Sequence, residues 1–230
     1  MSVAIVTGSA GGLGAAIVRR LHADGRAVAS VDLAEAGPPE AIRHYRADLT
    51  DLGGLDALVD RIEADAGPVA LLVNNAAYWR PTPFLELTAD QIRRTLTVNV
   101  AATLLLCQSV ARRMIARGEG GNIVNIASIA GRRGSSQVDY GASKAGVINL
   151  TMTLARELAA HGIRVNAVAP ALVDAGMGER LPPHVKEAFL AQTPLKRGAR
   201  PEEVANVVAF LAGEEASYVT GETIDVHGGL

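Results

Sequence analysis

The residues best suited to catalysis lie in the stretch SIAGRRGSSQVDYGASK, Ser128 to Lys144. Tyr140 and Lys144 are four residues apart in a helical pattern, so they share one face of a helix. An ammonium beside a phenol lowers the phenol's pKa, and a unit charge at ~4 Å with an effective dielectric of ~20 supplies about 4 kcal/mol. A tyrosine that titrates near ~10 needs about 3–4 kcal/mol to act as a base at neutral pH. The pair therefore predicts general acid/base chemistry, although the same spacing is typical of a buried ring beside a snorkelling lysine.

Ser128 is the third candidate in this stretch. It follows the apolar run Ile123–Ile126, which reads as a strand, and so stands near that strand's carboxyl end. A hydroxyl there can hydrogen-bond a reacting oxygen and fix its position.

The N-terminal stretch VTGSAGGLG is a candidate anion site. It reads Thr7-Gly8-x-x-x-Gly12-x-Gly14 and misses the strict G-x-G-x-x-G pattern, because Ala15 and Ala16 follow. A strand that ends in glycines and leads into a helix still suits a pyrophosphate, since helix N-terminal amides attract anions. The alternative is an ordinary tight turn between strand and helix.

Asp32 favours the nucleotide interpretation. It ends the second predicted strand at about the ~20-residue offset at which an acid accepts from a ribose 2′-hydroxyl. The same carboxylate repels a 2′-phosphate, which predicts NAD rather than NADP. Taken alone, Asp32 could be a solvated strand end.

The elements that must position these residues follow an alternating pattern. Apolar, β-branched runs separated by helical patterns predict a doubly wound α/β (Rossmann-type) fold, with a seven-stranded parallel sheet between helices on both faces. The predicted strands are Ala4–Val6, Ala27–Val31, His44–Arg46, Val69–Val73, Ile123–Ile126, Arg164–Val168 and Thr223–Val226. Thr88 and Gln91 predict a capping box, and Gly37-Pro38-Pro39 predicts a loop instead of a helix in the second crossover.

Residues 1–230 are expected to form one domain, in which the Pro- and Gly-punctuated stretch 170–201 is a lid over the site. The formal net charge of −2, without a long basic run, argues against nucleic acid or an anionic membrane as partner. Apolar runs too short to span a bilayer predict a cytoplasmic protein that binds small molecules or itself. The single cysteine, Cys107, reads as a buried thiol, and the histidines lack metal-ligand spacing, so no metal is expected.

Several motifs now stand in one order along the chain: Thr7-Gly8-x-x-x-Gly12-x-Gly14, Asn74-Asn75-Ala76-Ala77, Asn99, Ser128, Tyr140-x-x-x-Lys144 and Pro170-Ala171. Together they resemble the short-chain dehydrogenase/reductase family over essentially the whole chain. The resemblance implies four catalytic residues, Asn99, Ser128, Tyr140 and Lys144. Tyr140 would be the acid/base and Ser128 would orient the substrate oxygen. Lys144 would lower the tyrosine pKa and bind the nicotinamide ribose, and Asn99 would hold a water that links Lys144 to solvent.

The resemblance also implies a homotetramer, or a homodimer, built on the helices that contain Asn99 and Tyr140. With the glycine and Asp32 arguments, it gives the predicted NAD-binding residues: Gly8, Ser9, Gly12, Leu13, Gly14, Asp32, Leu33, Asp48, Leu49, Asn75, Ala76, Ala77, Tyr140, Lys144, Pro170 and Val173.

The sequence departs from the family pattern around the expected cofactor. Ala77 and Ala171 stand where glycine is usual, which is tolerable only if φ stays negative. Ala175 stands where a threonine often binds the carboxamide. Candidate substrate contacts are Tyr78, Trp79, Arg80, Leu172, Met177 and Leu181, with ordinary packing as the alternative. Arg132 and Arg133 could attract an anionic substrate, or be a solvated loop pair or an intersubunit contact.

The sequence thus predicts an NAD(H)-dependent oxidoreductase that interconverts a secondary alcohol and a ketone of a small molecule. One alternative is an NADP(H)-dependent carbonyl or 3-oxoacyl reductase. Another, from a different class, is a catalytically silent dinucleotide-binding sensor or scaffold.

Overall fold

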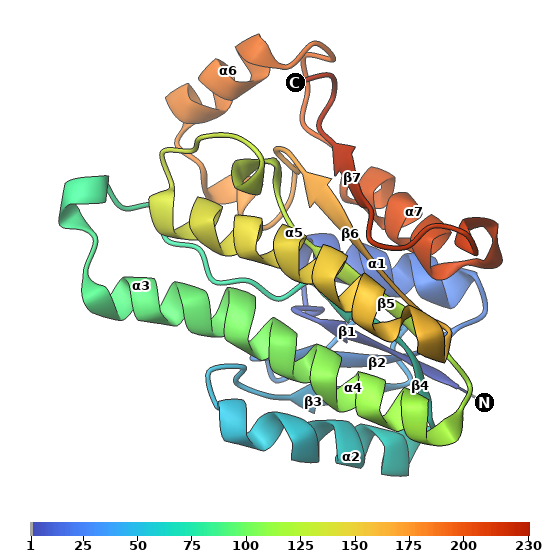
Figure 1. Ribbon diagram of the computed structural model, residues 1–230. Helices are drawn as coiled ribbons and strands as arrows, with labels where there is room; N and C mark the ends of the chain where they lie inside the picture. The colour runs from blue at the N-terminus through green and yellow to red at the C-terminus, as the bar shows by residue number, and fades with distance from the viewer. Residues whose placement is uncertain (1) are drawn as a thin grey trace.

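The computed structural model describes residues 2–230, and within them seven strands form one parallel sheet in the order β3-β2-β1-β4-β5-β6-β7 (Figure 1). The strands are β1 Val3–Thr7, β2 Ala27–Asp32, β3 Arg43–Arg46, β4 Val69–Asn74, β5 Gly121–Ile126, β6 Ile163–Pro170 and β7 Thr223–Val226. All seven predicted strands are confirmed, with ends that differ by at most two residues. The predicted fold class is therefore confirmed.

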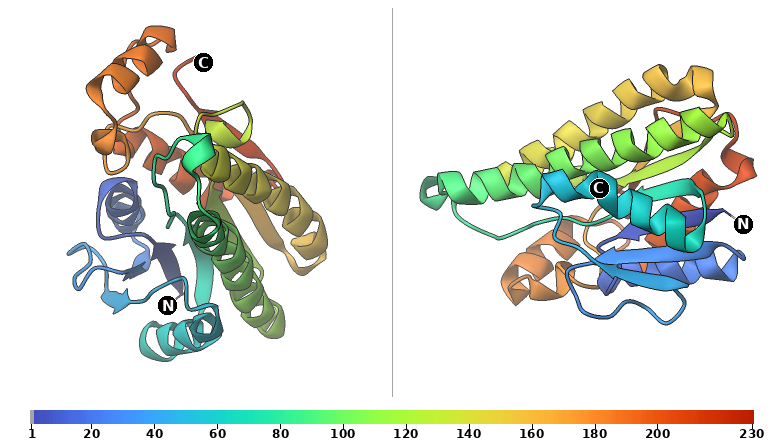
Figure 2. Two further views of the ribbon diagram at one scale, coloured as in Figure 1. Left: turned by 90° about the vertical axis from the view of Figure 1, so that its left-hand side faces the viewer. Right: turned by 90° about the horizontal axis from the view of Figure 1, so that it is seen from below.

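Helices cover both faces of the sheet, as Figure 2 shows. They are α1 Gly12–Ala23, α2 Leu55–Ala66, α3 Ala89–Leu96, α4 Thr103–Arg117, α5 Val138–Leu158, α6 Pro183–Gln192 and α7 Pro201–Ala212. Residues of β1 alternate between two cores: Val3 and Ile5 pack with side chains of α2 and α4, and Ala4 and Val6 pack with side chains of α1 and α7. A strand buried on both faces needs apolar residues at every position, which explains the continuous apolar run.

The sheet order places the site. The chain runs outward from β1 to β3 in one direction and from β4 to β7 in the other, so the order reverses between β1 and β4. In an open α/β sheet, ligands bind at the carboxyl ends of the strands beside such a reversal. The glycine run after β1, Asp32 at the end of β2 and Ser128 after β5 all lie along this edge.

Two local predictions have different outcomes. The crossover from β2 to β3 contains no helix, as Gly37-Pro38-Pro39 predicted. The capping box at Thr88 is only half formed. The Thr88 hydroxyl accepts from the Gln91 backbone N–H at 3.2 Å, but the Gln91 side chain turns away to Asp139 and the Arg80 carbonyl.

The segment between β6 and α7 rises above the carboxyl edge of the sheet and contains α6, which is orange in Figure 1. Its base is tied together, since the Ala199 N–H donates to the Leu172 carbonyl at 2.8 Å and the Asp174 N–H donates to the Ala199 carbonyl at 2.9 Å. Within residues 2–230, no helix has the length and apolar character needed to cross a membrane.

Candidate active site

Helix α5 carries both Tyr140 and Lys144, and the turn after β5 carries Ser128. Lys144 is 2% exposed, and its Nζ donates to the Ile126 carbonyl at 2.6 Å and lies 5.7 Å from the centre of the Tyr140 ring. The Ser128 hydroxyl accepts from the Ala130 N–H at 3.2 Å and reaches the Pro170 carbonyl at 3.5 Å. The structure therefore brings the three side chains together at one end of the sheet.

The acid/base balance differs from the sequence-based expectation. Burial raises the pKa of Tyr140 to about 12, against a smaller lowering by its hydrogen bond with Ser128. Burial also lowers the pKa of Lys144 to about 8. In the protein without ligand, burial outweighs any lowering of the tyrosine pKa by Lys144, because loss of water disfavours both charged forms and the ammonium is engaged by a carbonyl. Tyr140 is thus a phenol at neutral pH, which is the form of a proton donor. The role of Lys144 toward Tyr140 stays a prediction.

Asn99 lies in a wide π-helical turn, Thr97–Ala102, that joins α3 to α4. Its amide oxygen accepts from the Tyr78 N–H at 2.7 Å, and its amide nitrogen donates to the Tyr78 carbonyl at 3.0 Å and to Ser143 Oγ at 2.9 Å. Ser143 Oγ in turn donates to the Tyr140 carbonyl at 2.7 Å. The Asn99 side chain thus connects the loop after β4 to α5, the helix that carries Tyr140. Because its amide is engaged in these bonds, a water at Asn99 would have to hydrogen-bond to the backbone of the residue.

A buried polar cluster beside Tyr140 escaped the sequence analysis. The Asp139 carboxylate accepts from Thr95 Oγ1 at 2.6 Å and from Gln91 Nε2 at 3.4 Å. All three residues are buried. The Thr88-x-x-Gln91 pattern located Gln91 but assigned its side chain to the helix end instead of to α5.

The glycine run is a close-packed cradle. A Cβ at Gly8, whose φ is +63°, would lie 2.7 Å from Ala76 Cα, and a Cβ at Gly14 would fall on the Gly8 carbonyl oxygen. Gly12 has a φ of +54°, and its Cβ would lie 3.3 Å from Gly176 Cα. Side chains are excluded at Gly8 and Gly14, so at these positions the backbone itself forms the surface that leads into α1.

Two predicted cofactor residues have their polar groups turned inward. Ser9 is fully buried, and its hydroxyl bonds Ser30 Oγ at 3.0 Å and the Val31 carbonyl at 3.1 Å. The Asn75 amide donates to the carbonyls of Thr7 and Gly8 at 2.9 and 2.8 Å. Both side chains hold the loop in shape and leave only their backbone to face a ligand.

Asp32 stands where the sequence predicted, beside the glycine run. Its carboxylate accepts from the Ala10 N–H at 2.9 Å and from the Ala34 N–H at 3.1 Å. The two bonds fix the carboxylate at the end of β2 while leaving lone pairs for a further donor.

A cavity of about 190 Å³ lies next to Asp32. Seven of the predicted cofactor residues line it: Gly8, Asp32, Leu33, Asp48, Leu49, Ala76 and Ala77. Tyr78, a predicted substrate contact, lies here instead, together with Thr50, Arg94 and Val98, which the sequence analysis missed. Arg94 and Val98 are four residues apart in the helical stretch that leads to Asn99, and this spacing puts them on one helix face.

These residues fit a dinucleotide. The cradle excludes side chains, a carboxylate stands at the ribose offset, and the adjoining cavity has the apolar and polar lining that a nucleoside needs. Ala77 and Ala171 add no strain, because among residues 2–230 only Lys196 has a positive φ without being glycine. Within the same residues there is no group of three His, Cys, Asp or Glu side chains that could hold a metal ion.

Comparison with known proteins agrees with this geometry. A family model described as enoyl-(acyl carrier protein) reductase matches residues 8–230. The chain belongs to the short-chain dehydrogenase/reductase family. It is accordingly an oxidoreductase of alcohol and ketone groups.

Similar members of the family have different substrates in their names. The chain is 42% identical over 238 residues to cis-4-hydroxycyclohexanecarboxylate dehydrogenase of Sinomonas cyclohexanicum, covering 99% of this chain and 95% of that protein. It is 37% identical over 248 residues to (3R)-3-hydroxyacyl-CoA dehydrogenase of Rattus norvegicus, covering 100% and 96%. The crystal structure of NAD⁺-bound xylitol dehydrogenase superposes with a TM-score of 0.91 at 32% identity, covering 99% and 98%.

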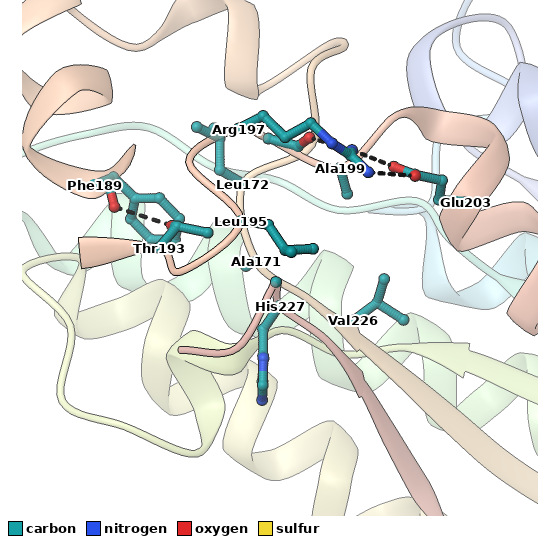
Figure 3. A pocket seen from close by; sticks show the side chains of 12 residues that line it. Ala171, Leu172, Phe189, Thr193, Leu195, Arg197, Ala199, Glu203, Val226 and His227 are labelled. Carbon is teal, nitrogen blue, oxygen red and sulfur yellow. Dashed lines mark hydrogen bonds and ion pairs between the residues drawn. The ribbon is translucent and has the colours of Figure 1, made fainter. Parts of the chain in front are cut away.

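The dehydrogenase/reductase has a second cavity, of about 180 Å³, at the base of the 170–201 segment (Figure 3). Ala171, Leu172, Phe189 and Leu195 line it, beside Arg197, which pairs with Glu203 through two contacts of 2.7 Å. Leu172, a predicted substrate contact, is 7% exposed and lies here; Met177 and Leu181 do not line this cavity.

Arg132 of the dehydrogenase/reductase pairs with Asp225 at 2.8 Å and donates to the Thr223 carbonyl at 2.7 Å, while its side chain stays 39% exposed. It fastens the turn after Ser128 to β7. A contact of Arg132 with substrate or with another subunit stays a prediction. Cys107 is a buried thiol as predicted, 1% exposed, and burial raises its pKa to about 12.

Proposed function

We propose that this protein is an NAD(H)-dependent oxidoreductase that interconverts a secondary alcohol and a ketone of a small molecule. The observation that carries the proposal is the meeting of Ser128, Tyr140 and Lys144 beside a side-chain-free glycine cradle. The names of two relatives, a hydroxycyclohexanecarboxylate dehydrogenase and a 3-hydroxyacyl-CoA dehydrogenase, support a secondary alcohol as the reacting group.

The preference for NAD rests on Asp32. A carboxylate that already accepts two backbone N–H groups is held at the ribose end of the cradle, where it repels a 2′-phosphate and accepts from a 2′-hydroxyl. The NAD⁺-bound xylitol dehydrogenase supports the same preference. Backbone groups of Gly8 to Gly14, the cavity lining beside Asp32 and the side chains of Tyr140 and Lys144 would hold the dinucleotide. When bound, it supplies the acceptor or donor of hydride at the nicotinamide ring.

The chain's own residues then handle the proton. In reduction, the Tyr140 hydroxyl donates its proton to the ketone oxygen while Ser128 hydrogen-bonds the same oxygen and fixes its position. In oxidation, the Tyr140 phenolate takes the proton of the alcohol. Lys144 is an ammonium below its pKa of about 8. Its charge, together with the positive ring that a bound oxidised nicotinamide would add, favours the phenolate form of Tyr140.

The test measures absorbance at the reduced-nicotinamide band with NAD or NADP and a panel of cyclic and open-chain secondary alcohols. Tyr140→Phe removes the proton carrier, so we expect kcat to fall at least about 10²-fold while NADH still binds through Lys144 and the backbone of the cradle. Tyr218→Phe is the matched control, because Tyr218 is fully exposed, and it should retain wild-type kinetics. Turnover of the Tyr140→Phe protein at the wild-type rate would falsify the mechanism.

The same measurements separate the two alternatives. Tighter binding and faster turnover with NADP would support a carbonyl or 3-oxoacyl reductase, a reading for which Asp32 is the obstacle. Dinucleotide binding without turnover of any alcohol or ketone would support a catalytically silent sensor or scaffold. The complete set of predicted catalytic residues argues against this alternative: Asn99, Ser128, Tyr140 and Lys144 are all present.

Three coarser proposals accompany the reaction. Residues 170–201 are proposed as a lid of a single domain, because Gly176 within them lies close to Gly12 of the cradle.

A homotetramer, or a homodimer, is proposed on α4 and α5, which lie side by side in Figure 1 and expose apolar side chains such as Leu104 and Met152. The cytoplasm is proposed as the compartment, since Cys107 is a buried free thiol and disulfides are rare in cytosolic proteins.

A further inference from the structure

The cavity beside Asp32 has a charge pattern that the glycine cradle does not explain. Asp32 and Asp48 both line it, and two carboxylates repel the phosphates of any nucleotide that enters. Among the described residues of its lining, Arg94 is the one with a cationic side chain. It comes from the last turn of α3, across the cavity from the strand ends that carry the two acids.

Arg94 is held in place by an aromatic partner. Its guanidinium carbon lies 4.9 Å from the centre of the Tyr78 ring, within the range of a cation–π contact. Tyr78 is itself fixed, because the buried Asn99 side chain bonds both its N–H, at 2.7 Å, and its carbonyl, at 3.0 Å. Arg94 and Asn99 belong to one continuous helical stretch. Arg94 is therefore an exposed cation at the wall of the cavity, and its contact with the fixed Tyr78 ring orients it.

The guanidinium acts on the inside of the cavity. The pKa of Asp48 is lowered first by two hydrogen bonds from Thr50, from its N–H at 2.9 Å and its hydroxyl at 2.8 Å, and then by the positive charge of Arg94. An ionised Asp48 next to a nucleotide needs such a neighbour to offset its charge. Exposed arginines elsewhere on α3 serve another purpose: Arg93 pairs with Asp90 at 2.7 Å on the outer surface.

We propose that Arg94, backed by Tyr78, is a cofactor-binding residue that covers the adenine moiety of the dinucleotide. The inference rests on the proposed function, since it assumes a dinucleotide in this cavity. A guanidinium stacked on a ring presents a flat, weakly hydrated face to a purine, which an ammonium does not. Arg94 serves the adenine and not the ribose, because Asp32 occupies the ribose end.

The test is a fluorescence titration of the purified full chain with NADH and with NADPH, in the wild type and in Arg94→Ala, Arg94→Lys and Arg93→Ala. Arg94→Ala should raise the Kd for NADH about tenfold, the size of one desolvated cation–π contact, and should raise the Kd for NADPH by the same factor. Arg94→Lys keeps the charge but loses the plane, so it should also bind more weakly than the wild type. Arg93→Ala, one position away, should bind within about twofold of the wild type.

Three results would overturn the inference: unchanged NADH binding in Arg94→Ala, an equal loss in Arg93→Ala, or a loss confined to NADPH, which would put the guanidinium at a 2′-phosphate. Should Arg94→Ala fold poorly, Tyr78→Leu removes the backing ring from the other side and should give a comparable loss for NADH. Failure of the proposed function is separate, because it shows in the wild type as an absence of dinucleotide binding or turnover.

Discussion

At the residue scale, Tyr140 and Lys144 are ionisable side chains in an environment that disfavours their charged forms. Among the described residues, the Ile126 carbonyl is the only close polar partner of the Lys144 ammonium. Burial lowers the pKa of Lys144 and raises the pKa of Tyr140, so it opposes the charged form of both side chains. A Lys that keeps its charge in such a place costs stability, since its solvation is lost and no carboxylate replaces it. The costly burial of an ionisable group is typical of a functional site.

Replacing the ammonium should therefore stabilise the protein and abolish its activity. The folded pKa of Lys144, about 8, lies below its unfolded value of 10.5, so the penalty is fully present below pH 8 and fades as pH rises toward 10.5. We expect Lys144→Met to raise Tm at pH 7 by about 2–6 °C, once the lost hydrogen bond to Ile126 is allowed for, and to raise it less at pH 10. Calorimetry at both pH values measures this. Lys186→Met, at a half-exposed site, is the control, and a lower Tm for Lys144→Met at pH 7 would contradict the argument.

At the element scale, the turn from β1 into α1 works because three glycines let backbone approach backbone. The glycines in it are not equivalent. A Cβ at Gly14 would clash with the Gly8 carbonyl oxygen, whereas a Cβ at Gly11 meets nothing within 4 Å, and the Gly11 φ of −161° is open to any residue. The cradle thus depends on Gly14 packing and not on glycine content.

A matched pair of methyl additions tests this difference. Gly14→Ala must push β1 and α1 apart, so we expect at least tenfold weaker NADH binding and a lower Tm. Gly11→Ala should change NADH binding by less than about twofold and slightly stabilise the loop, because alanine restricts the unfolded chain. Titration and thermal melting of both proteins report the outcome, and equal behaviour of the two variants would show that the cradle is not close-packed in solution.

At the scale of the whole molecule, the sheet is covered on both faces, and the layer that contains α4 and α5 exposes apolar side chains on its outside. Leu104 on α4 and Met152 on α5 are each 42% exposed, and Leu96 at the end of α3 is equally so. Figure 1 shows α4 and α5 side by side along one face. Apolar side chains gathered on one face are typical of a surface that another chain covers.

A charge placed on this face should dissociate the assembly. We expect the wild type to elute as a tetramer or dimer, and Leu104→Glu combined with Met152→Glu to elute at the mass of one chain, because two buried carboxylates without partners are costly. Light scattering on a size-exclusion column gives the masses. Ile42→Glu, on an exposed loop before β3, should leave the mass unchanged. A wild type that elutes as a monomer would rule out the proposed assembly.

The sequence by itself determined whatever depends on neighbours along the chain. The short continuous apolar runs indicated the strands, the four-residue spacing placed Tyr140 and Lys144 on one helix face, and Gly37-Pro38-Pro39 predicted that the second crossover contains no helix. Local conformational preferences encode these features, and they need no knowledge of distant contacts.

The tertiary structure decided whatever depends on burial and on contacts between distant segments. It turned the polar groups of Ser9 and Asn75 inward, paired Arg132 with Asp225 of β7, placed Tyr78 and Arg94 in the lining of the cavity beside Asp32, and raised the pKa of Tyr140, which spacing alone predicted to fall. Desolvation and long-range hydrogen bonding set these outcomes, and neither can be read from the distance between two residues in a sequence.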